Sequence, residues 1–124
     1  MMNLVDSSGW LEYFANEKNA DFFAEPIEDT NNLIVSTINL YEVFRKVLQQ
    51  KDENAAMQAI ALMQQGKIIE VDSAISLHAA KQSVELNLPM ADSIILATAR
   101  AFDAELWTQD SNFKNFPDVN YIQK

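Results

Sequence analysis

Four acidic residues occupy comparable places in this sequence, beside short apolar runs or at the starts of helical patterns. Asp6 directly follows one apolar run, and Asp110 comes two residues after another. Glu42 lies in the first turn or so of a predicted helix, and Asp92 opens a further one. Carboxylate oxygens are the ligands that Mg²⁺ and Mn²⁺ prefer. If the fold brings these acids together, they could hold a hard divalent cation.

Helix capping is an alternative role for Asp6, Glu42 and Asp110. Acids are common at helix starts because they accept hydrogen bonds from free amides and offset the helix dipole. The segment 39–42 resembles a capping box in which Glu42 reaches back to the first free amides. Asp72, which also ends a predicted strand and precedes a helix, is interpreted as an ordinary cap.

Asp92 is harder to account for by capping, because its helix is apolar on every side. Its neighbours on the same helix face are Ile95, Leu96 and Ala99. We therefore expect the Asp92 carboxylate to be partly buried. Burying a carboxylate without a partner costs several kcal/mol, so a cation or dedicated hydrogen-bond donors should lie nearby.

The elements that would position these acids alternate along the chain. Apolar runs predict five short strands, at residues 2–5, 33–35, 67–71, 106–108 and 119–122. Helical patterns begin at Ser7 and cover residues 19–24, 38–50, 55–65, 73–86 and 90–102, with a loop around Pro26. This alternation favours a parallel sheet covered by helices on both faces. Ligands gather beyond the carboxyl ends of such strands, where the acids are expected.

Two of these helices carry apolar stripes that we expect to face the core. The stripe of the 38–50 helix consists of Leu40, Phe44, Val47 and Leu48. The stripe of the 73–86 helix, continued past its end, consists of Leu77, Ala80, Val84 and Leu88.

Arg45 and Lys46 share the opposite face of the 38–50 helix with Glu42. They could form local ion pairs, but we favour phosphate contacts beside the acids.

Composition excludes several other classes of site. The chain has 124 residues, 48% of them hydrophobic, which suits one domain, residues 1–124, with one core. The absence of cysteine excludes thiolate metal sites and cysteine nucleophiles, and one histidine, expected on the surface, cannot make a zinc cage. A net charge of −9 is the wrong sign for passive adhesion to nucleic acid.

No membrane span is found, and we expect a cytoplasmic protein. Trp10 and Trp107 are expected in the core.

Four segments together resemble the PIN-domain family, in particular its short VapC-type toxin members. They are Leu4–Ser8, Asn39–Val43, Leu88–Ala99 and Leu106–Phe113, in family order and at family spacing. The resemblance implies a PIN-like three-layer α/β fold, with a central parallel sheet of four to five strands flanked by helices. It also implies a Mg²⁺- or Mn²⁺-dependent nuclease for single-stranded RNA segments, neutralised by an antitoxin protein and present as a homodimer.

By the same resemblance, the four acids fall on the family's metal-binding positions, and Thr108 falls on a supporting hydroxyl position. The hypothesis is hydrolysis of RNA phosphodiesters by metal-activated water. Asp6 and Asp92 are then the strongest ligands, Glu42 a ligand or water-orienting base, and Asp110 with Thr108 outer support. Substrate contacts must come from a few cations, namely Arg45, Lys46 and Arg100.

Two other classes of function share parts of this pattern. A phosphoacceptor signalling domain would present paired acids after its first strand and a lysine after a later one, whereas this chain has Asp6-Ser7-Ser8 and Thr108-Gln109-Asp110. A catalytically silent interaction module of the same fold would have no need to keep all four acids. The sequence leaves open which RNA is cleaved, whether one or two metal ions bind, and the oligomeric state.

Overall fold

A sheet of five parallel strands forms the centre of the computed structural model, which describes residues 1–124. The strand order is β3-β2-β1-β4-β5. The strands are β1 (Asn3–Val5), β2 (Leu33–Ser36), β3 (Lys67–Ile69), β4 (Glu105–Thr108) and β5 (Val119–Tyr121). All four pairings are parallel, so all five carboxyl ends point to one edge of the sheet. The predicted α/β fold with a parallel sheet of four to five strands is confirmed.

The chain reverses its direction of progress across the sheet between β1 and β4. From β1 it moves outward through β2 to β3, and it returns to β4 on the other side of β1 before ending at β5. In the paired register, Leu4 lies beside Leu106 and Val5 beside Trp107. Such a switch point leaves a crevice outside the carboxyl ends of the two central strands, and ligands bind there in open α/β sheets.

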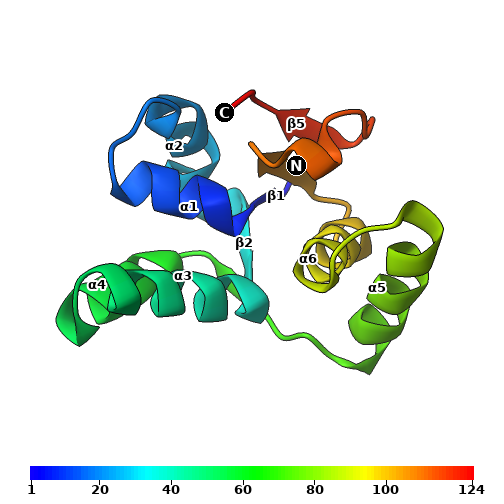
Figure 1. The fold of residues 1–124 in the computed structure, drawn as a ribbon, viewed down its shortest axis with the longest axis horizontal. Helices are drawn as coiled ribbons and strands as arrows, with labels where there is room; N and C mark the ends of the chain where they lie inside the picture. Colours follow the sequence, from blue (N-terminus) through cyan, green and yellow to red (C-terminus); the bar gives the residue numbers. More distant parts are fainter.

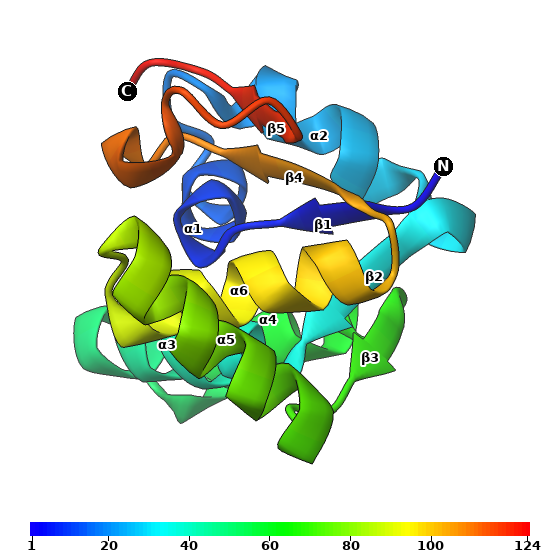
Figure 2. The same ribbon diagram turned by 90° about the vertical axis from the view of Figure 1, so that its right-hand side faces the viewer.

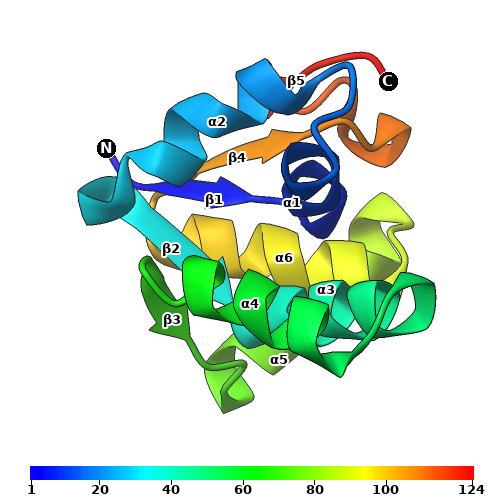
Figure 3. The same ribbon diagram turned by 90° about the vertical axis from the view of Figure 1, so that its left-hand side faces the viewer.

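Helices cover both faces of the sheet and complete three layers (Figures 1, 2 and 3). One face carries α1 (Ser7–Phe14), α2 (Ala20–Glu28), α3 (Thr37–Gln50) and α4 (Glu53–Met63), which stand in front in Figure 3. The other carries α5 (Ser73–Leu86) and α6 (Met90–Ala101), which stand in front in Figure 2. Two short 3₁₀ turns, η1 (Thr30–Asn32) and η2 (Ser111–Phe113), complete the elements. No helix is both long and apolar enough to cross a membrane.

Strand side chains alternate between two apolar cores, one for each helical layer. Leu4 and Ile34 belong to the core under α5 and α6, whereas Val5 and Val35 belong to the core under α1 to α4. As predicted, both tryptophans are buried, and both lie in the second core.

Gly9 lets α1 approach this second core closely. A Cβ atom at Gly9 would lie 2.6 Å from the ring of Phe23 and 2.8 Å from Val5 Cγ1. Any larger residue would force α1 away from β1, because packed interiors tolerate little extra volume. The glycine therefore fixes the start of α1, where Asp6, Ser7 and Ser8 lie.

Three details of the helices differ from the sequence prediction. Pro26 lies inside α2 and is buried, whereas a loop was expected there. Proline removes one backbone hydrogen bond and ends α2 two residues later, so the disruption is confined to the last turn of the helix. In α3, Leu40, Phe44 and Val47 pack against the second core as predicted, but Leu48 is 43% exposed. The fully buried positions of α3 are Asn39 and Val43. The buried face of α3 is thus turned towards Ser7 in α1.

The apolar stripe predicted for α5 is right at Leu88, which is buried just after the helix, and wrong at Leu77, Ala80 and Val84, which are exposed. Leu77 and Val84 are 72% and 85% exposed, while Ile75 and Ala79 are buried. The helix α5 packs on its neighbour α6 through a narrow face in which Ala79 permits close approach. Leu77 and Val84 consequently face outward. Asp72 caps α5 by accepting a hydrogen bond from the amide of Ile75 at 2.9 Å, as predicted.

Candidate active site

A cleft of about 540 Å³ opens beyond the carboxyl ends of β1 and β4. It lies at the switch point of the sheet, where the topology places a ligand site. All four sequence-predicted acids line it, together with two of the predicted cations. The lining residues are Asp6, Ser7, Ser8, Leu11, Tyr41, Glu42, Arg45, Lys46, Asp92 and Asp110.

Asp6 lies at the end of β1 and is 5% exposed. It caps α1, because its Oδ1 accepts a hydrogen bond of 2.7 Å from the amide of Ser7. Its Oδ2 accepts from the hydroxyls of Thr108 at 2.8 Å and Ser8 at 3.4 Å. Capping and a place in the cleft therefore belong to the same carboxylate, although the sequence pattern had presented them as alternatives.

Burial raises the pKa of Asp6 to about 7, because the ionised form loses its hydration. The negative charges of Asp92 and Asp110 contribute to this rise in pKa, while the hydrogen bonds from Thr108 and Ser7 oppose it. No lysine or arginine pairs with this carboxylate. Asp6 is a buried acid that lacks a compensating positive charge.

Asp92 lies in the first turn of α6 and is half-buried, as its apolar helix predicted. Its Oδ2 accepts a hydrogen bond of 2.9 Å from the side-chain amide of Asn112. Burial raises the pKa of Asp92 to about 6, with Asp110 and Glu42 adding repulsion and Asn112 lowering it. The dedicated donor expected near Asp92 is therefore present, and it comes from η2.

Asp110 and Thr108 are connected through the backbone at the end of β4. The amide of Asp110 donates to the Thr108 hydroxyl oxygen at 2.9 Å, and that hydroxyl donates in turn to Asp6. Asp110 caps η2 by accepting a hydrogen bond of 2.9 Å from the amide of Asn112. The short turn η2 thus presents a carboxylate and the amide that contacts Asp92.

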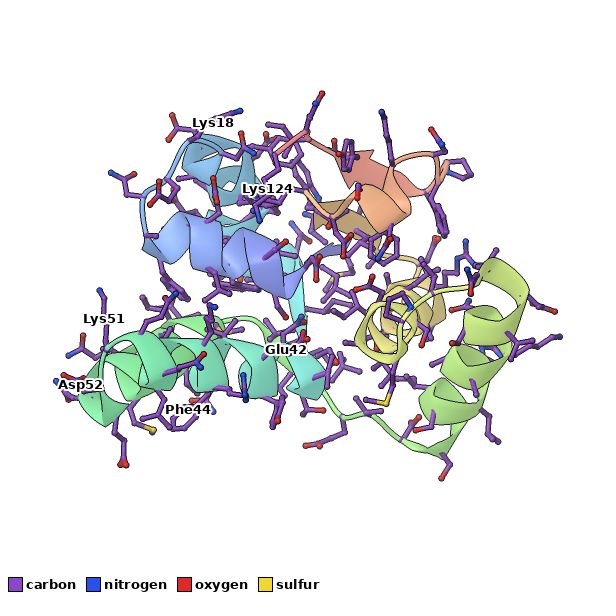
Figure 4. The ribbon with its side chains drawn as sticks, viewed as in Figure 1. Lys18, Glu42, Phe44, Lys51, Asp52 and Lys124 are labelled. Carbon is purple, nitrogen blue, oxygen red and sulfur yellow. The ribbon has the colours of Figure 1, made fainter.

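Glu42 is held from the side by α1 and does not take part in a capping box. The box at this helix consists of Ser36 and Asn39, which corrects the expected role of Glu42. The hydroxyl of Ser7 donates to Oε1 of Glu42 at 2.7 Å and accepts from the Asn39 amide at 2.9 Å. Figure 4 shows Glu42 on the side of α3 that faces the start of α1, with Phe44 pointing away.

Of the three basic residues predicted to contact substrate, two line the cleft and one does not. Arg45 and Lys46 are exposed, line the cleft and form no ion pair with Glu42. Arg100, also expected to contact substrate, lies outside the cleft and pairs with Asp118 at 3.1 Å. Its place near the end of α6 directs it away from the strand ends. His78 is exposed on α5, consistent with the surface position expected.

Three neutral residues that position the acids were not singled out from the sequence: Ser7, Asn39 and Asn112. Each has a residue type that is common at helix starts and turns, so its type alone carries no signal for a site. The one signal available in the sequence is a side chain that can donate a hydrogen bond and lies next to a candidate acid or three residues before it. Asn39, three residues before Glu42, is an example, and it acts on Glu42 through Ser7. Contacts between distant segments, such as Ser7 with Glu42, cannot be read from spacing.

The side chains of the cleft that could bind a metal ion do so through carboxylate and hydroxyl oxygens, and such ligands suit a hard divalent cation. No three of the acidic side chains are close enough to form a ready metal-ligating group. They line one cleft while each is held by its own hydrogen bonds to Thr108, Ser7 or Asn112. The arrangement concentrates negative charge at the switch point and leaves cations at its margin.

The family model of the PIN domain matches residues 4–119. The chain belongs to the PIN-domain family. This PIN domain is 32% identical over 96 residues to Ribonuclease VapC4 of Mycobacterium tuberculosis, covering 71% of this chain and 74% of that protein. The resemblance drawn from the four sequence segments is therefore confirmed.

Solved structures show the same fold at lower identity. A toxin-antitoxin complex from Klebsiella pneumoniae contains a chain with a TM-score of 0.80 and 23% identity, covering 95% of both chains. VapC20 of Mycobacterium tuberculosis, described as a toxin that cleaves the sarcin-ricin loop, has a TM-score of 0.73 and 17% identity. That match covers 90% of this PIN domain and 92% of VapC20. At these identities the likeness establishes the fold alone.

Proposed function

We propose that this PIN domain is a Mg²⁺- or Mn²⁺-dependent endoribonuclease and the toxin of a toxin–antitoxin pair. The observation that carries the proposal is the cleft at the switch point. Four carboxylates from four separate segments of the chain line it, together with Arg45 and Lys46. The name of the 32% identical relative, a ribonuclease of the VapC type, supports the same activity.

The chemistry of these oxygen ligands suits a divalent cation, although no three of the acids form a ready metal-ligating group. Asp6 is 5% exposed and has no positively charged partner, and burial together with neighbouring acids raises its pKa to about 7. A cation bound by Asp6, Glu42, Asp92 and Asp110 would offset this repulsion. When bound, it would supply activation of water and stabilisation of the charge that develops on the phosphate during hydrolysis.

The chain's own residues orient the reacting groups. Thr108 and Ser7 hold the two oxygens of Asp6 in fixed directions. Ser7 occupies Oε1 of Glu42 and leaves Oε2 without a protein hydrogen bond, so Oε2 is the atom that could orient water or accept its proton. Arg45 and Lys46 are placed to bind the phosphates of the substrate.

The proposed partners follow from the relatives. Because one structural neighbour is a toxin-antitoxin complex, we infer an antitoxin protein as the partner of this chain. From the family resemblance we also propose a homodimer and a cytoplasmic location. The antitoxin must be removed before activity is measured, since it would neutralise the toxin.

The test is cleavage of labelled RNA by the purified chain in Mg²⁺ or Mn²⁺. Asp92→Asn and an EDTA control should both lose cleavage. Asp72→Asn is the matched control, because it makes the same chemical change in a helix cap outside the cleft. We expect this control to retain wild-type cleavage, since asparagine also caps helices well.

Cleavage unaffected by Asp92→Asn would overturn the assignment of the site. A folded wild-type chain that cleaves no RNA in either metal would overturn the enzyme proposal. The same fold would then serve as a silent interaction module, and its partner would be the next object of study.

A further inference from the structure

A second hollow of about 450 Å³ adjoins the candidate active site. The two hollows share Ser8 and Asp110, so they are continuous across the end of β4. The second is bounded by Tyr121 of β5 and by Gln123 and Lys124, which follow it. Arg45 and Lys46 line only the first hollow, and Lys124 lines only the second.

Tyr121 is fixed at the level of the acids by the register of the sheet. It pairs with Thr108, whose hydroxyl holds Asp6, and the next residue, Ile122, donates its amide to the carbonyl of Thr108 at 3.0 Å. Val119 and Ile122 pack against the two cores, whereas Tyr121 packs against neither. The Tyr121 side chain is half-buried and lines the second hollow.

The segment after β5 is held in place by a buried polar network. The side-chain amide of Asn19 donates to the Gln123 carbonyl at 3.2 Å and to Oε1 of Gln109 at 2.9 Å. Gln109 contacts Glu12 at 3.3 Å, and Asn19 and Gln109 are 5% and 4% exposed. Because buried polar groups are costly unless paired, this network specifies one position for the wall of the hollow. Lys124 follows the anchored Gln123 directly.

The charges of the two hollows are arranged for an extended polyanion. The chain has 9 basic residues against 18 acidic ones, yet two basic residues line the first hollow and one lines the second. Each of the two hollows that meet at Asp110 therefore has at least one basic residue in its lining. Tyr121 adds an aromatic ring, and nucleic-acid bases stack on such rings without sequence preference.

We propose that the second hollow is a nucleotide subsite, so that a single RNA strand crosses the acids from Arg45 and Lys46 to Tyr121 and Lys124. A base stacks on Tyr121 and a phosphate lies near Lys124 Nζ. This inference rests on the proposed ribonuclease function and adds the path of its substrate. In Figure 4, Lys124 and Glu42 lie on either side of the start of α1, whereas Lys18 and Lys51 lie towards the outer edge.

The test measures binding, so it does not depend on cleavage. The full chain carries Asp92→Asn, in Mg²⁺, and its affinity for a fluorescein-labelled, ten-nucleotide single-stranded RNA of random sequence is measured by anisotropy. Lys124→Ala, Tyr121→Leu, Tyr121→Phe and Arg45→Ala are compared on this background. Lys51→Ala is the matched control, because it removes the same charge outside both hollows.

We expect Tyr121→Leu to weaken binding roughly tenfold, since stacking on an aromatic ring is lost, while Tyr121→Phe binds like the parent. Lys124→Ala should lower the slope of log affinity against log salt by about 0.7, the value for one phosphate contact on a single strand. Lys51→Ala should leave affinity and slope unchanged.

Two results would overturn the subsite. If Arg45→Ala weakens binding while Lys124→Ala and Tyr121→Leu match Lys51→Ala, the strand takes another path and the proposed function stands. If the parent binds no RNA, and the wild type cleaves none, both proposals fail together. Should Tyr121→Leu not fold, the salt slope of Lys124→Ala decides the question alone.

Discussion

The hydroxyl of Thr108 donates a hydrogen bond of 2.8 Å to Oδ2 of Asp6, joining two neighbouring strand ends that are 102 residues apart in the chain. The same hydroxyl oxygen accepts the amide of Asp110 at 2.9 Å. Thr108 is fully buried, so its hydroxyl depends on these two protein partners and not on water. Thr108 thereby orients the carboxylate of Asp6 and fixes the start of η2, which Asp110 caps.

Thr108→Val should therefore impair RNA cleavage, although the two side chains are almost equal in size. The substitution keeps the shape but removes the donor to Asp6 and the acceptor for Asp110. We expect kcat/KM for RNA cleavage to fall by about 10- to 100-fold, as for other residues that orient metal ligands. The free energy of unfolding should fall by about 1–3 kcal/mol, because a buried acceptor is left unpaired.

A matched control for this change is available in α6. Thr98 is also fully buried and donates to the carbonyl of Ile94 at 2.8 Å, away from the cleft. Thr98→Val should leave cleavage unchanged, and Thr108→Ser should restore most of it. Equal activity of Thr108→Val and wild type would show that the hydroxyl does not position the site.

The stability of the metal-free chain should decrease as pH rises, through Asp6. Its folded-state pKa of about 7 exceeds the reference value of 3.8, so the folded state binds the proton more tightly than the unfolded state between these values. Ionisation then costs folding free energy, about 2–3 kcal/mol between pH 5 and pH 8. Urea denaturation in EDTA at both pH values measures this loss.

Asp6→Asn isolates the contribution of this one carboxyl. The amide is neutral at both pH values, so the pH-dependent loss should be smaller by that amount in the variant. Repulsion among the chain's other acids affects both proteins alike. An identical pH dependence in the two proteins would mean that Asp6 is not the group responsible.

The acids of this site were predictable from the sequence, whereas the residues that hold them were not. A carboxylate at the end of a predicted parallel strand, such as Asp6, or on an apolar helix, such as Asp92, is unusual for its surroundings and so attracts notice. Ser7, Asn39 and Asn112 are ordinary for theirs, because serine and asparagine cap helices and form turns throughout proteins. Their roles depend on contacts between distant segments.

The strands were predicted more securely than the helix faces for a related reason. A short parallel strand is buried on both sides, so its run of apolar residues suffices to find it. A helix such as α5 can present more than one stripe, and the prediction favoured the larger residues Leu77 and Val84. The stripe that packs contains Ala79. The helix α6 was predicted, but periodicity does not tell which face of α5 packs against it.

Divalent metal should stabilise the folded chain, and more strongly at pH 8 than at pH 5. At pH 8, Asp6 and Asp92 must both be ionised, and a bound cation offsets their repulsion. At a hundredfold excess over its dissociation constant, Mg²⁺ should raise Tm by at least about 5 °C. Differential scanning fluorimetry with a MgCl₂ series at each pH measures this.

The Asp92→Asn chain supplies the comparison for metal binding. It lacks one proposed ligand, so its Tm should respond less to MgCl₂ than that of the wild type. CaCl₂ and NaCl at equal ionic strength distinguish binding at the site from general screening of a chain with a net charge of −9. A Tm that rises equally in all three salts would contradict a specific site.

Asn112 should be needed for full cleavage activity, because it donates a hydrogen bond to Asp92 without adding charge. Its side-chain amide donates to Oδ2 at 2.9 Å and lowers the pKa of Asp92. Asn112→Asp exchanges that donor for a negative charge beside two acids, so Asp92 loses its fixed direction and the repulsion grows. We expect cleavage at low Mg²⁺ to fall by about 10- to 100-fold, with partial recovery at high Mn²⁺.

An equivalent pair elsewhere in the chain tests this role of Asn112. Asn32 donates to both carboxylate oxygens of Asp29, at 3.2 and 3.0 Å, on an exposed surface. Asn32→Asp makes the same chemical change and the same change in net charge, but outside the cleft. Unchanged cleavage in Asn32→Asp together with a loss in Asn112→Asp would locate the effect at Asp92, because net charge and a lost surface hydrogen bond are common to both variants.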